Sequence, residues 1–396
     1  MYRNTYFEIN LDALADNFKN IKNELKDYKY YIAVVKSNCY GHGSYSINAL
    51  IKAGANYLAI SNLLEAENIR KINKTIPIIC LEPINLEYIK KAQELNIILT
   101  VSSLEYLKKL KNLNDLDSKN IKIHLKINSG MNRLGFNDKL EVEKAVSIIN
   151  KNFILEGVYS HFHSLGITDE YYDKQVNNFL DITSLIDLKK VKMIHFSRSS
   201  SVVNHEKLPF CNSVRLGAIL YGIDVSIKEP KNLRKIKNNL IRKFKKISKV
   251  TYENNISLKN ALSFYSEVIE INFVKKDSYI GYGLNYKLEE DSHIAVVCAG
   301  YSDGLKQNDT NRHVIINDKK YLIVGKVCAG MFMIKVSNEV KVGDKVTIYG
   351  ENLNIKSIAR NAKASEYDLY SSLHEAIPRI YIENKKEIYK EIWEVK

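Results

Sequence analysis

The chain has 396 residues, of which 45% are hydrophobic and 26% charged, and its net charge is +14. This length and composition predict a globular protein of about two domains with sizeable cores. Lysine is abundant throughout the chain, so the net charge alone does not predict a nucleic-acid partner, and we expect none. No apolar run approaches the roughly 20 residues that span a bilayer, and the N-terminus lacks a signal-peptide core, so we expect a cytoplasmic protein without a membrane partner.

Apolar, β-branched runs alternate with helical patterns over the first 225 residues. A helix opens the series, because Leu11, Leu14, Phe18 and Ile21 recur three and four residues apart on one face. The predicted strands are residues 31–38, 57–61, 76–81, 97–103, 122–128, 155–162, 192–197 and 213–221. Eight strands alternating with helices predict an α/β fold, a parallel (β/α)8 TIM barrel over residues 11–227.

A basic segment follows the predicted barrel. Residues 228–249 carry ten basic residues and one acidic residue. We interpret residues 228–257 as a solvated basic linker or insert, and an anionic partner for it stays open. From residue 258 onward, short strand-like runs between turn residues predict a mostly β C-terminal domain (258–396), which the N-terminal strand 1–10 joins. The five cysteines show no CxxC or CxxH spacing, so we expect neither a disulfide framework nor a metal site.

Polar side chains stand near the ends of several predicted strands. They are Lys36, Lys126 with Arg133 shortly after it, His161, Ser199 and Arg215. In such a barrel the C-terminal strand ends meet at one rim, where active sites lie. A lysine there can hold an anion or form a Schiff base with pyridoxal phosphate. Donors to a phosphate at Ser199 and at the backbone of Gly217 and Ala218, with Arg215 facing a ring nitrogen, favour pyridoxal phosphate.

Short motifs run the length of the chain in a fixed order. They are AVVKSNCYGHG (33–43), HLKINSGMNRLGF (124–136), YSHF (159–162), HFSRS (195–199), VRLGAILYG (214–222), GYGLNY (281–286), GYSDG (300–304), GKVCAGMFMI (325–334) and EYD (366–368). Together they resemble the alanine racemase family, the fold-type III pyridoxal-phosphate enzymes, over nearly the whole chain. The resemblance implies a barrel that binds pyridoxal 5'-phosphate, a C-terminal β-domain, and a head-to-tail homodimer with shared active sites.

The resemblance also implies the catalytic groups of an isomerase that interconverts L- and D-alanine. Racemisation removes a proton from one face of the α-carbon and returns one to the other, so two bases must flank that carbon. Lys36 would carry the cofactor and serve one face, and Tyr282 of the partner subunit would serve the other. Arg215 would hydrogen-bond the pyridine nitrogen, and His161 would link Arg215 to Tyr282. An arginine, unlike a carboxylate, leaves that nitrogen unprotonated, which limits side reactions such as transamination.

Binding roles follow from the same resemblance. The phosphate would be held by Tyr40, Ser199, the backbone at Gly217 and Ala218, and Tyr367. The substrate would meet Arg133, the main chain at Ala329, and Tyr301 in the entry corridor. Lys126 matches a lysine that is carbamylated in many members, where it positions the arginine equivalent to Arg133.

Five positions depart from the usual family pattern. Asn128 replaces an aspartate, Asn132 a glycine and Arg198 an asparagine, and Ala329–Gly330 replaces a methionine–aspartate pair. Ala329 keeps the main-chain N–H, while the pocket becomes roomier and less negative. A hydrophobic pocket discriminates against one methylene by only about 1–3 kcal/mol, so we expect alanine as the leading substrate with a broadened range.

Three other readings stay open at this point. The chain could racemise another amino acid, such as serine or one with a larger side chain. It could be a decarboxylase of similar layout, although GYGLNY and EYD favour the racemase pattern. It could also be a catalytically silent protein that binds pyridoxal phosphate, because Arg198 and Ala329–Gly330 are unusual.

Overall fold

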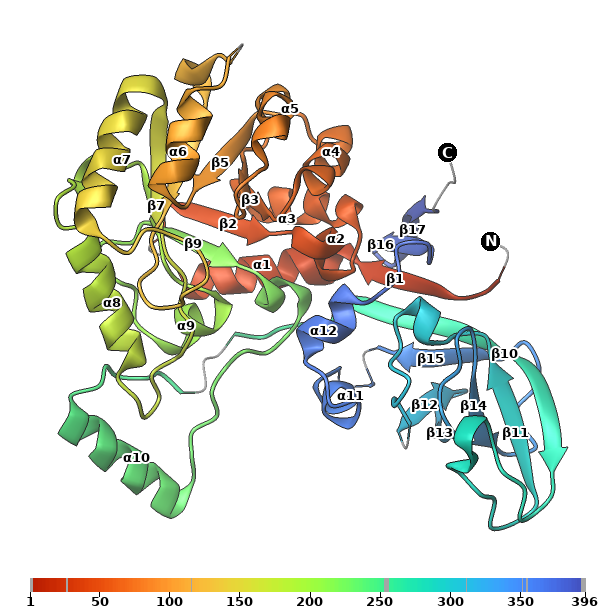
Figure 1. Cartoon of the computed structure of the whole chain (residues 1–396). Coiled ribbons are helices and arrows are strands. Elements are labelled where there is room, and N and C mark those ends of the chain that lie inside the picture. The colour runs from red at the N-terminus through yellow and green to blue at the C-terminus, as the bar shows by residue number, and fades with distance from the viewer. Residues whose placement is uncertain are drawn as a thin grey trace.

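The computed structural model describes residues 3–25, 28–114, 116–252, 256–310, 312–350, 352–353 and 355–392. These residues form two sheets, an eight-stranded parallel sheet and a nine-stranded, mostly antiparallel sheet. Figure 1 shows the two sheets side by side, with the early part of the chain in the first and the late part in the second.

The eight-stranded sheet is the predicted barrel, and the prediction of a (β/α)8 barrel followed by a mostly β domain is confirmed. Its hydrogen-bonded order is β9-β2-β3-β4-β5-β6-β7-β8. The strands are β2 (Tyr30–Val34), β3 (Tyr57–Ile60), β4 (Ile78–Cys80), β5 (Ile97–Val101), β6 (Lys122–Lys126), β7 (Ile154–Tyr159), β8 (Met193–His195) and β9 (Ser213–Leu216). Asn212, just before β9, joins the two ends of the series, because its backbone N–H donates to Ile194 O at 3.2 Å and its Oδ1 accepts from Ile194 N at 2.9 Å.

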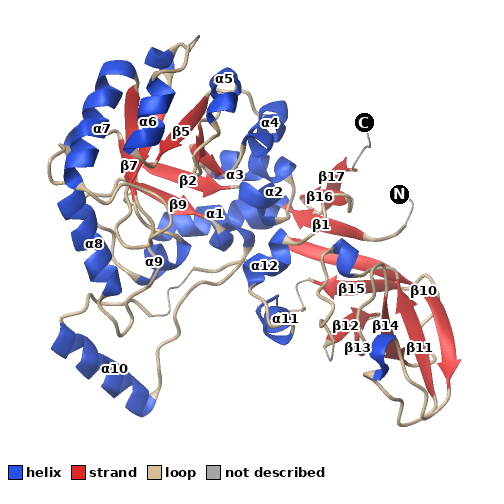
Figure 2. Ribbon diagram, in the orientation of Figure 1, coloured by secondary structure: helices blue, strands red, loops and turns tan. Residues whose placement is uncertain are grey.

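Helices cover the outside of the barrel (Figure 2). They are α1 (Leu11–Glu24), α3 (Ile47–Ala53), α4 (Leu63–Ile72), α5 (Ile89–Glu94), α6 (Leu104–Lys111), α7 (Lys139–Asn152), α8 (Tyr171–Ile182) and α9 (Ser199–Asn204). The side chains of Asn62, Ser103 and Asp138 cap α4, α6 and α7 by accepting from the N–H three residues further on. These caps fix where each helix begins, and therefore the loops that precede it.

The nine-stranded sheet has the order β11-β14-β13-β12-β15-β10-β1-β16-β17. Its strands are β1 (Tyr6–Asn10), β10 (Leu262–Val274), β11 (Ser292–Val297), β12 (His313–Ile316), β13 (Lys319–Val324), β14 (Phe332–Val336), β15 (Lys345–Tyr349), β16 (Arg379–Glu383) and β17 (Lys386–Glu391). β1 pairs with β10 antiparallel and with β16 parallel, so the first strand of the chain lies inside the C-terminal sheet. The helices α11 (Ile355–Asn361) and α12 (Glu366–Ser371) lie between this sheet and the barrel (Figure 1).

The basic segment forms the helix α10 (Asn232–Lys245), which projects from the body of the molecule in Figure 1. None of its residues is buried, and its large apolar side chains face solvent: Leu233, Ile236, Leu240 and Phe244. Within the residues described above, no helix is long and apolar enough to cross a membrane.

All eight predicted barrel strands end earlier than the sequence pattern indicated, and two of them end at least four residues earlier. The strand predicted over 31–38 ends at Val34, and the one predicted over 213–221 ends at Leu216 and continues as a 3-10 turn, Ala218–Tyr221. Apolar residues continue past both ends because they are buried in the turns, so hydrophobicity alone overestimated the strand lengths.

Candidate active site

A cavity of about 650 Å³ opens at the C-terminal ends of the barrel strands, a volume typical of small-molecule sites. It brings together most of the predicted site residues: Lys36, Tyr40, Lys126, Arg133, His161, Ser199, Arg215, Gly217, Ala218 and Tyr367. Arg198 lines it as well. The lining therefore carries five lysine or arginine side chains, and Glu82 is its single carboxylate, so the cavity suits an anionic occupant.

Lys36 and Tyr40 are placed by an unusual turn after β2. Residues 37–40 all have φ between 51° and 54°, in the left-handed region that non-glycine residues seldom occupy. The carboxylate of Glu65 supports the turn, since it accepts from Ser37 N at 2.6 Å and from Ser61 N at 2.8 Å. Such strain persists only where the surroundings impose it, and it gathers at functional sites. Here it places both Lys36 and Tyr40 on the wall of one cavity.

Arg215 lies behind the cavity, 3% exposed, and is held by several acceptors. Its Nη2 donates to Ser160 O at 2.7 Å, to Phe196 O at 3.1 Å and to His161 Nδ1 at 3.2 Å. Burial lowers the pKa of Arg215 to about 10, so the guanidinium keeps its charge at neutral pH. Burial, together with Arg215, holds the pKa of His161 well below its ordinary value. His161 is therefore neutral, with Nδ1 accepting and its proton on Nε2.

Lys126 ends β6 inside the barrel, with its Nζ 4.3 Å from the centre of the Tyr159 ring. Burial and the charges of Arg215 and Arg133 hold the pKa of Lys126 well below its ordinary value. This setting favours the uncharged, nucleophilic form of the Lys126 amine.

A cradle for a compact anion lies opposite Lys36. The Ser199 Oγ accepts from Gly217 N at 3.0 Å. A Cβ at Gly217 would lie 3.0 Å from Tyr40 Oη and 3.7 Å from Ser199 Oγ, so only glycine leaves this space free. The ring of Tyr367 lies 6.3 Å from that of Tyr40. Hydroxyl and backbone donors around a space kept open by a glycine fit a phosphate group.

Arg198 adds a cation to this cradle. Its Nε is buried without a hydrogen-bond partner among the described residues. Burial raises the pKa of Tyr367, and the charge of Arg198 partly offsets that rise, which places the two side chains close together. The charge of Arg198 adds to the preference of the cavity for an anionic occupant.

Three predicted site residues do not line this cavity, namely Tyr282, Tyr301 and Ala329. Tyr282 is 71% exposed, at the tip of the loop between β10 and β11. Ala329 lies beside Tyr301 in the C-terminal domain, where Tyr301 N donates to Cys328 O at 3.0 Å and Ser302 N donates to Ala329 O at 2.9 Å. All three residues are exposed on the C-terminal domain.

Two of the unusual positions preserve the turn that carries Arg133. Asn132 has φ 56°, a left-handed conformation that asparagine tolerates. The Oδ1 of Asn128 accepts from Gly130 N at 3.2 Å and from Asn132 N at 2.9 Å, a contact that an amide makes as well as a carboxylate does. A Cβ at Gly330 would meet no atom within 4 Å, so the backbone there does not require glycine.

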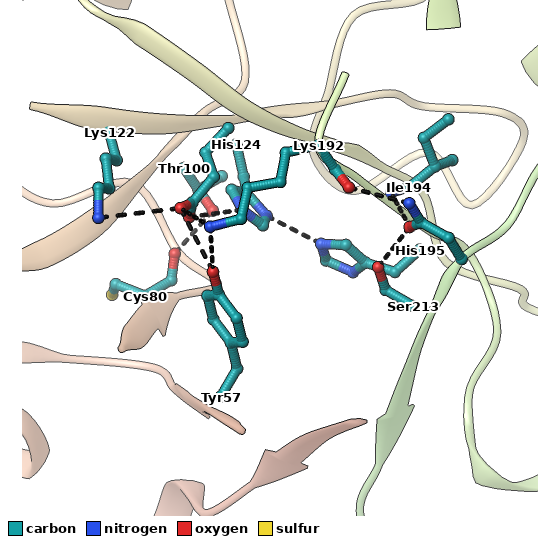
Figure 3. A network of polar contacts seen from close by, with 11 residues as sticks. Tyr57, Cys80, Thr100, Lys122, His124, Lys192, Ile194, His195 and Ser213 are labelled. Carbon is teal, nitrogen blue, oxygen red and sulfur yellow. Dashed lines mark hydrogen bonds and ion pairs between the residues drawn. The ribbon is translucent and has the colours of Figure 1, made fainter. Parts of the chain in front are cut away.

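A group of buried residues behind Arg215 was not predicted. His195 and His124 face each other inside the barrel (Figure 3), and Glu156 lies beyond His124. Two features of the sequence could have indicated these residues. The motif HFSRS contains His195, and His124 stands two residues before Lys126 on the same strand, so that both side chains lie on the same face.

The fold and the site together define a class of protein: a (β/α)8 barrel enzyme with a lysine in a cation-rich cavity at the strand ends, followed by a β-domain. Comparison with known proteins gives the family. Residues 9–225 match the family model described as alanine racemase, N-terminal domain, and residues 261–381 match the alanine racemase C-terminal domain. The chain belongs to the alanine racemase family, and the prediction of an enzyme of that family is confirmed. α10 lies between the two matched regions.

Individual relatives agree over nearly the full length. Alanine racemase of Borreliella burgdorferi (strain ZS7) is 33% identical over 382 residues, which cover 95% of this chain and 96% of that protein. Alanine racemase of Anoxybacillus flavithermus is 31% identical and covers 97% of this chain and 96% of its own length. The crystal structure of alanine racemase from Bacillus anthracis with bound L-Ala-P has a TM-score of 0.86 and 30% identity, and covers 99% of this chain and 98% of that one.

Proposed function

We propose that the chain is a pyridoxal-phosphate-dependent racemase that interconverts L- and D-alanine. The observation that carries the proposal is the single cavity wall shared by Lys36, a cradle of neutral phosphate donors and the buried Arg215. Lys36 would hold the cofactor, Tyr40, Ser199, Tyr367 and the backbone at Gly217 and Ala218 its phosphate, and Arg215 its ring nitrogen. Arg198 would add a charged phosphate contact. When bound, the cofactor supplies an electron sink that stabilises negative charge at the substrate α-carbon.

The chain's own groups would carry the proton. The Lys36 amine would take or return the α-proton on one face, and the Tyr282 phenol on the other. Arg133 would hold the substrate carboxylate, which fixes the α-carbon between the two groups. The neutral His161 donates from Nε2 on the side away from Arg215, where it would orient the phenol of Tyr282.

The position of Tyr282 supports a shared site. Because this tyrosine is exposed and does not line the cavity of its own chain, it would serve the Lys36 of a second subunit. Tyr301 and Ala329 are exposed on the same domain and would accompany it. A head-to-tail homodimer satisfies this arrangement, with two equivalent sites.

Lys126 would be carbamylated. Its uncharged amine is the form that attacks carbon dioxide, and the resulting carbamate anion would lie between Arg133 and Arg215. That anion would orient Arg133 toward the substrate carboxylate. The modification would place an anion beside the exposed Arg133 and the buried Arg215 and so would pair their charges.

Alanine is the proposed preferred substrate because the relatives across the family comparison are named alanine racemases. The small side chains of Ala329 and Gly330 favour a wider range, with racemisation of serine or a larger amino acid as the second candidate. We further propose that the enzyme acts in the cytoplasm and supplies D-alanine for the cell wall.

The test combines a spectroscopic and a kinetic measurement. Protein loaded with pyridoxal phosphate should be yellow, and borohydride followed by peptide mapping should find the cofactor on Lys36. Circular dichroism should then follow racemisation for a panel of L-amino acids, with alanine fastest. A yellow protein that racemises none of them would support a silent binder, and release of carbon dioxide would support a decarboxylase.

A further inference from the structure

Behind Arg215, a row of buried side chains crosses the barrel from the cavity to its opposite end. Arg215 Nη1 contacts His195 Nδ1, and His195 Nε2 lies 2.9 Å from His124 Nδ1. His124 Nε2 faces Glu156 Oε2 at 3.5 Å. Arg215, His195, His124 and Glu156 are each 3% exposed or less. We call these four residues the hydrogen-bond chain.

The far end of the hydrogen-bond chain is anchored by a lysine and a tyrosine. Glu156 Oε1 accepts from Lys192 Nζ at 2.9 Å and from Tyr57 Oη at 3.4 Å, and Lys192 also donates to Tyr57 at 2.7 Å. Figure 3 shows the amino group of Lys192 and the hydroxyl of Tyr57 close together, on the side of His124 away from His195. Burial alone would raise the pKa of Glu156, but the hydrogen bonds from His124 and Lys192 outweigh it and lower the pKa to about 2. Glu156 is therefore a carboxylate.

The donors and acceptors give the hydrogen-bond chain one direction. A guanidinium only donates, so His195 Nδ1 must be bare. Burial and the charge of Arg215 hold the pKa of His195 well below its ordinary value, so its single proton is on Nε2 and is donated to His124. His124, likewise neutral through burial, then carries its proton on Nε2, which faces the carboxylate of Glu156. At 3.5 Å the last contact is longer than a normal hydrogen bond, yet neither atom has another partner among the described residues.

The barrel interior is shaped for this arrangement. A Cβ at Gly157 would lie 2.6 Å from the His124 ring, so glycine at this point of β7 makes room for the imidazole. The His195 ring stacks on Tyr159, with centroids 4.7 Å apart and planes 10° apart. Both rings are thereby held in fixed orientations, as a directional chain of hydrogen bonds requires.

We propose that His195, His124 and Glu156 are positioning residues that fix Arg215 as a charged donor and point every proton behind it away from the cavity. The proposal rests on the proposed function, in which Arg215 faces the cofactor's ring nitrogen. Neither histidine can pass a proton toward that nitrogen, because the single ring proton of each is committed to the next acceptor on the far side. Glu156 sets the direction, although it lies at the opposite end of the barrel.

The test reads the histidine tautomers directly. Two-dimensional proton–nitrogen spectra of the full-length protein, labelled with nitrogen-15 histidine, distinguish protonation at Nδ1 from protonation at Nε2, and His195→Asn and His124→Asn variants assign the signals. The wild-type protein should show both rings protonated at Nε2 alone. A His195 ring protonated at Nδ1 would overturn the proposal.

Glu156→Gln should reverse the hydrogen-bond chain. Lys192 only donates, so it holds the amide oxygen of the glutamine and turns the amide nitrogen toward His124. His124 Nε2 must then accept, and the proton moves to Nδ1 and meets His195. The turnover number should fall about 10- to 100-fold with little change in KM.

The control is Tyr57→Phe, which removes one contact to Glu156 and keeps its charge; it should leave both tautomers unchanged. Unchanged tautomers in Glu156→Gln would overturn the proposal. The spectra need no substrate, so the two proposals can fail separately. If the protein shows the predicted tautomers but racemises no amino acid, the proposed function is refuted and the direction of the hydrogen-bond chain is not.

Discussion

Replacing Arg198 by the asparagine usual in this family should selectively weaken cofactor binding. The guanidinium lines the cavity beside Ser199 and Tyr367, with a buried Nε that has no partner among the described residues. A hydrogen bond to a charged group contributes about 1.5–3 kcal/mol, which corresponds to about 10- to 100-fold in Kd. Because the side chain is only partly buried, we expect the lower part of that range, about 10- to 30-fold.

The assay is a fluorescence titration of the cofactor-free protein with pyridoxal phosphate and, separately, with pyridoxal, which lacks the phosphate. Arg198→Asn should lose affinity for pyridoxal phosphate and bind pyridoxal as the wild-type protein does. Arg234→Asn makes the same change of charge on the exposed helix α10 and should alter neither Kd. Equal losses for both compounds, or wild-type affinity for both, would refute a phosphate contact at Arg198.

Four further predictions address other parts of the account. With carbon-13 bicarbonate, the protein should show a carbamate carbonyl resonance that disappears in Lys126→Met; its absence from the wild type would contradict carbamylation. Mixed dimers of one Lys36→Ala subunit and one Tyr282→Phe subunit should be active although neither variant is active alone, because one of the two shared sites then has both its lysine and its tyrosine. An inactive mixture would argue against shared sites. The pKa of Glu156 is about 2 in the folded state and about 4.3 in the unfolded state, so ionisation of Glu156 stabilises the fold by about 3 kcal/mol above pH 4.3. In denaturant titrations the wild-type protein should therefore be more stable than Glu156→Gln above pH 4.3, and this difference in the free energy of unfolding should vanish as the pH falls toward 2. Phe244→Ser on α10 should change the free energy of unfolding by less than about 0.5 kcal/mol, because this side chain is 92% exposed, and a larger loss would mean that another surface covers it.

The alternation of the barrel strands with helices could be predicted from the sequence because each buried parallel strand is an apolar run. Lys126 ends β6, two residues before the end predicted for that strand. The same reasoning could not locate the end of β2. Val35 and Cys39 are as apolar and as buried as strand residues, while residues 37–40 are bent into a left-handed turn by contacts with Glu65, which is distant in the sequence.

The candidate site was predictable where a side chain follows directly from a strand end. Arg215 and His161 meet at 3.2 Å because neighbouring positions on the rim of a barrel converge. The rest of the hydrogen-bond chain beyond Arg215 was not predicted, because His124, Glu156 and His195 come from three different strands and no motif spacing joins them. Pairing of β6, β7 and β8, which only the folded register supplies, brings His124, Glu156 and His195 together.

Tyr282 is exposed in the single chain, and its proposed role is in the site of a second subunit. Its loop rests on a small apolar cluster of Ile280, Leu288, Ile294 and Val324, so the tip is supported although the tyrosine itself is exposed. A supported, exposed aromatic side chain suits a role on a second subunit.

Proton exchange at the substrate α-carbon tests the central claim most directly. Holoenzyme incubated with L-alanine in heavy water should yield D-alanine that carries deuterium at the α-position, with the conversion lost in Lys36→Ala. Chiral chromatography with mass spectrometry measures both the configuration and the label. L-Alanine recovered without D-alanine and without α-deuterium would contradict the account.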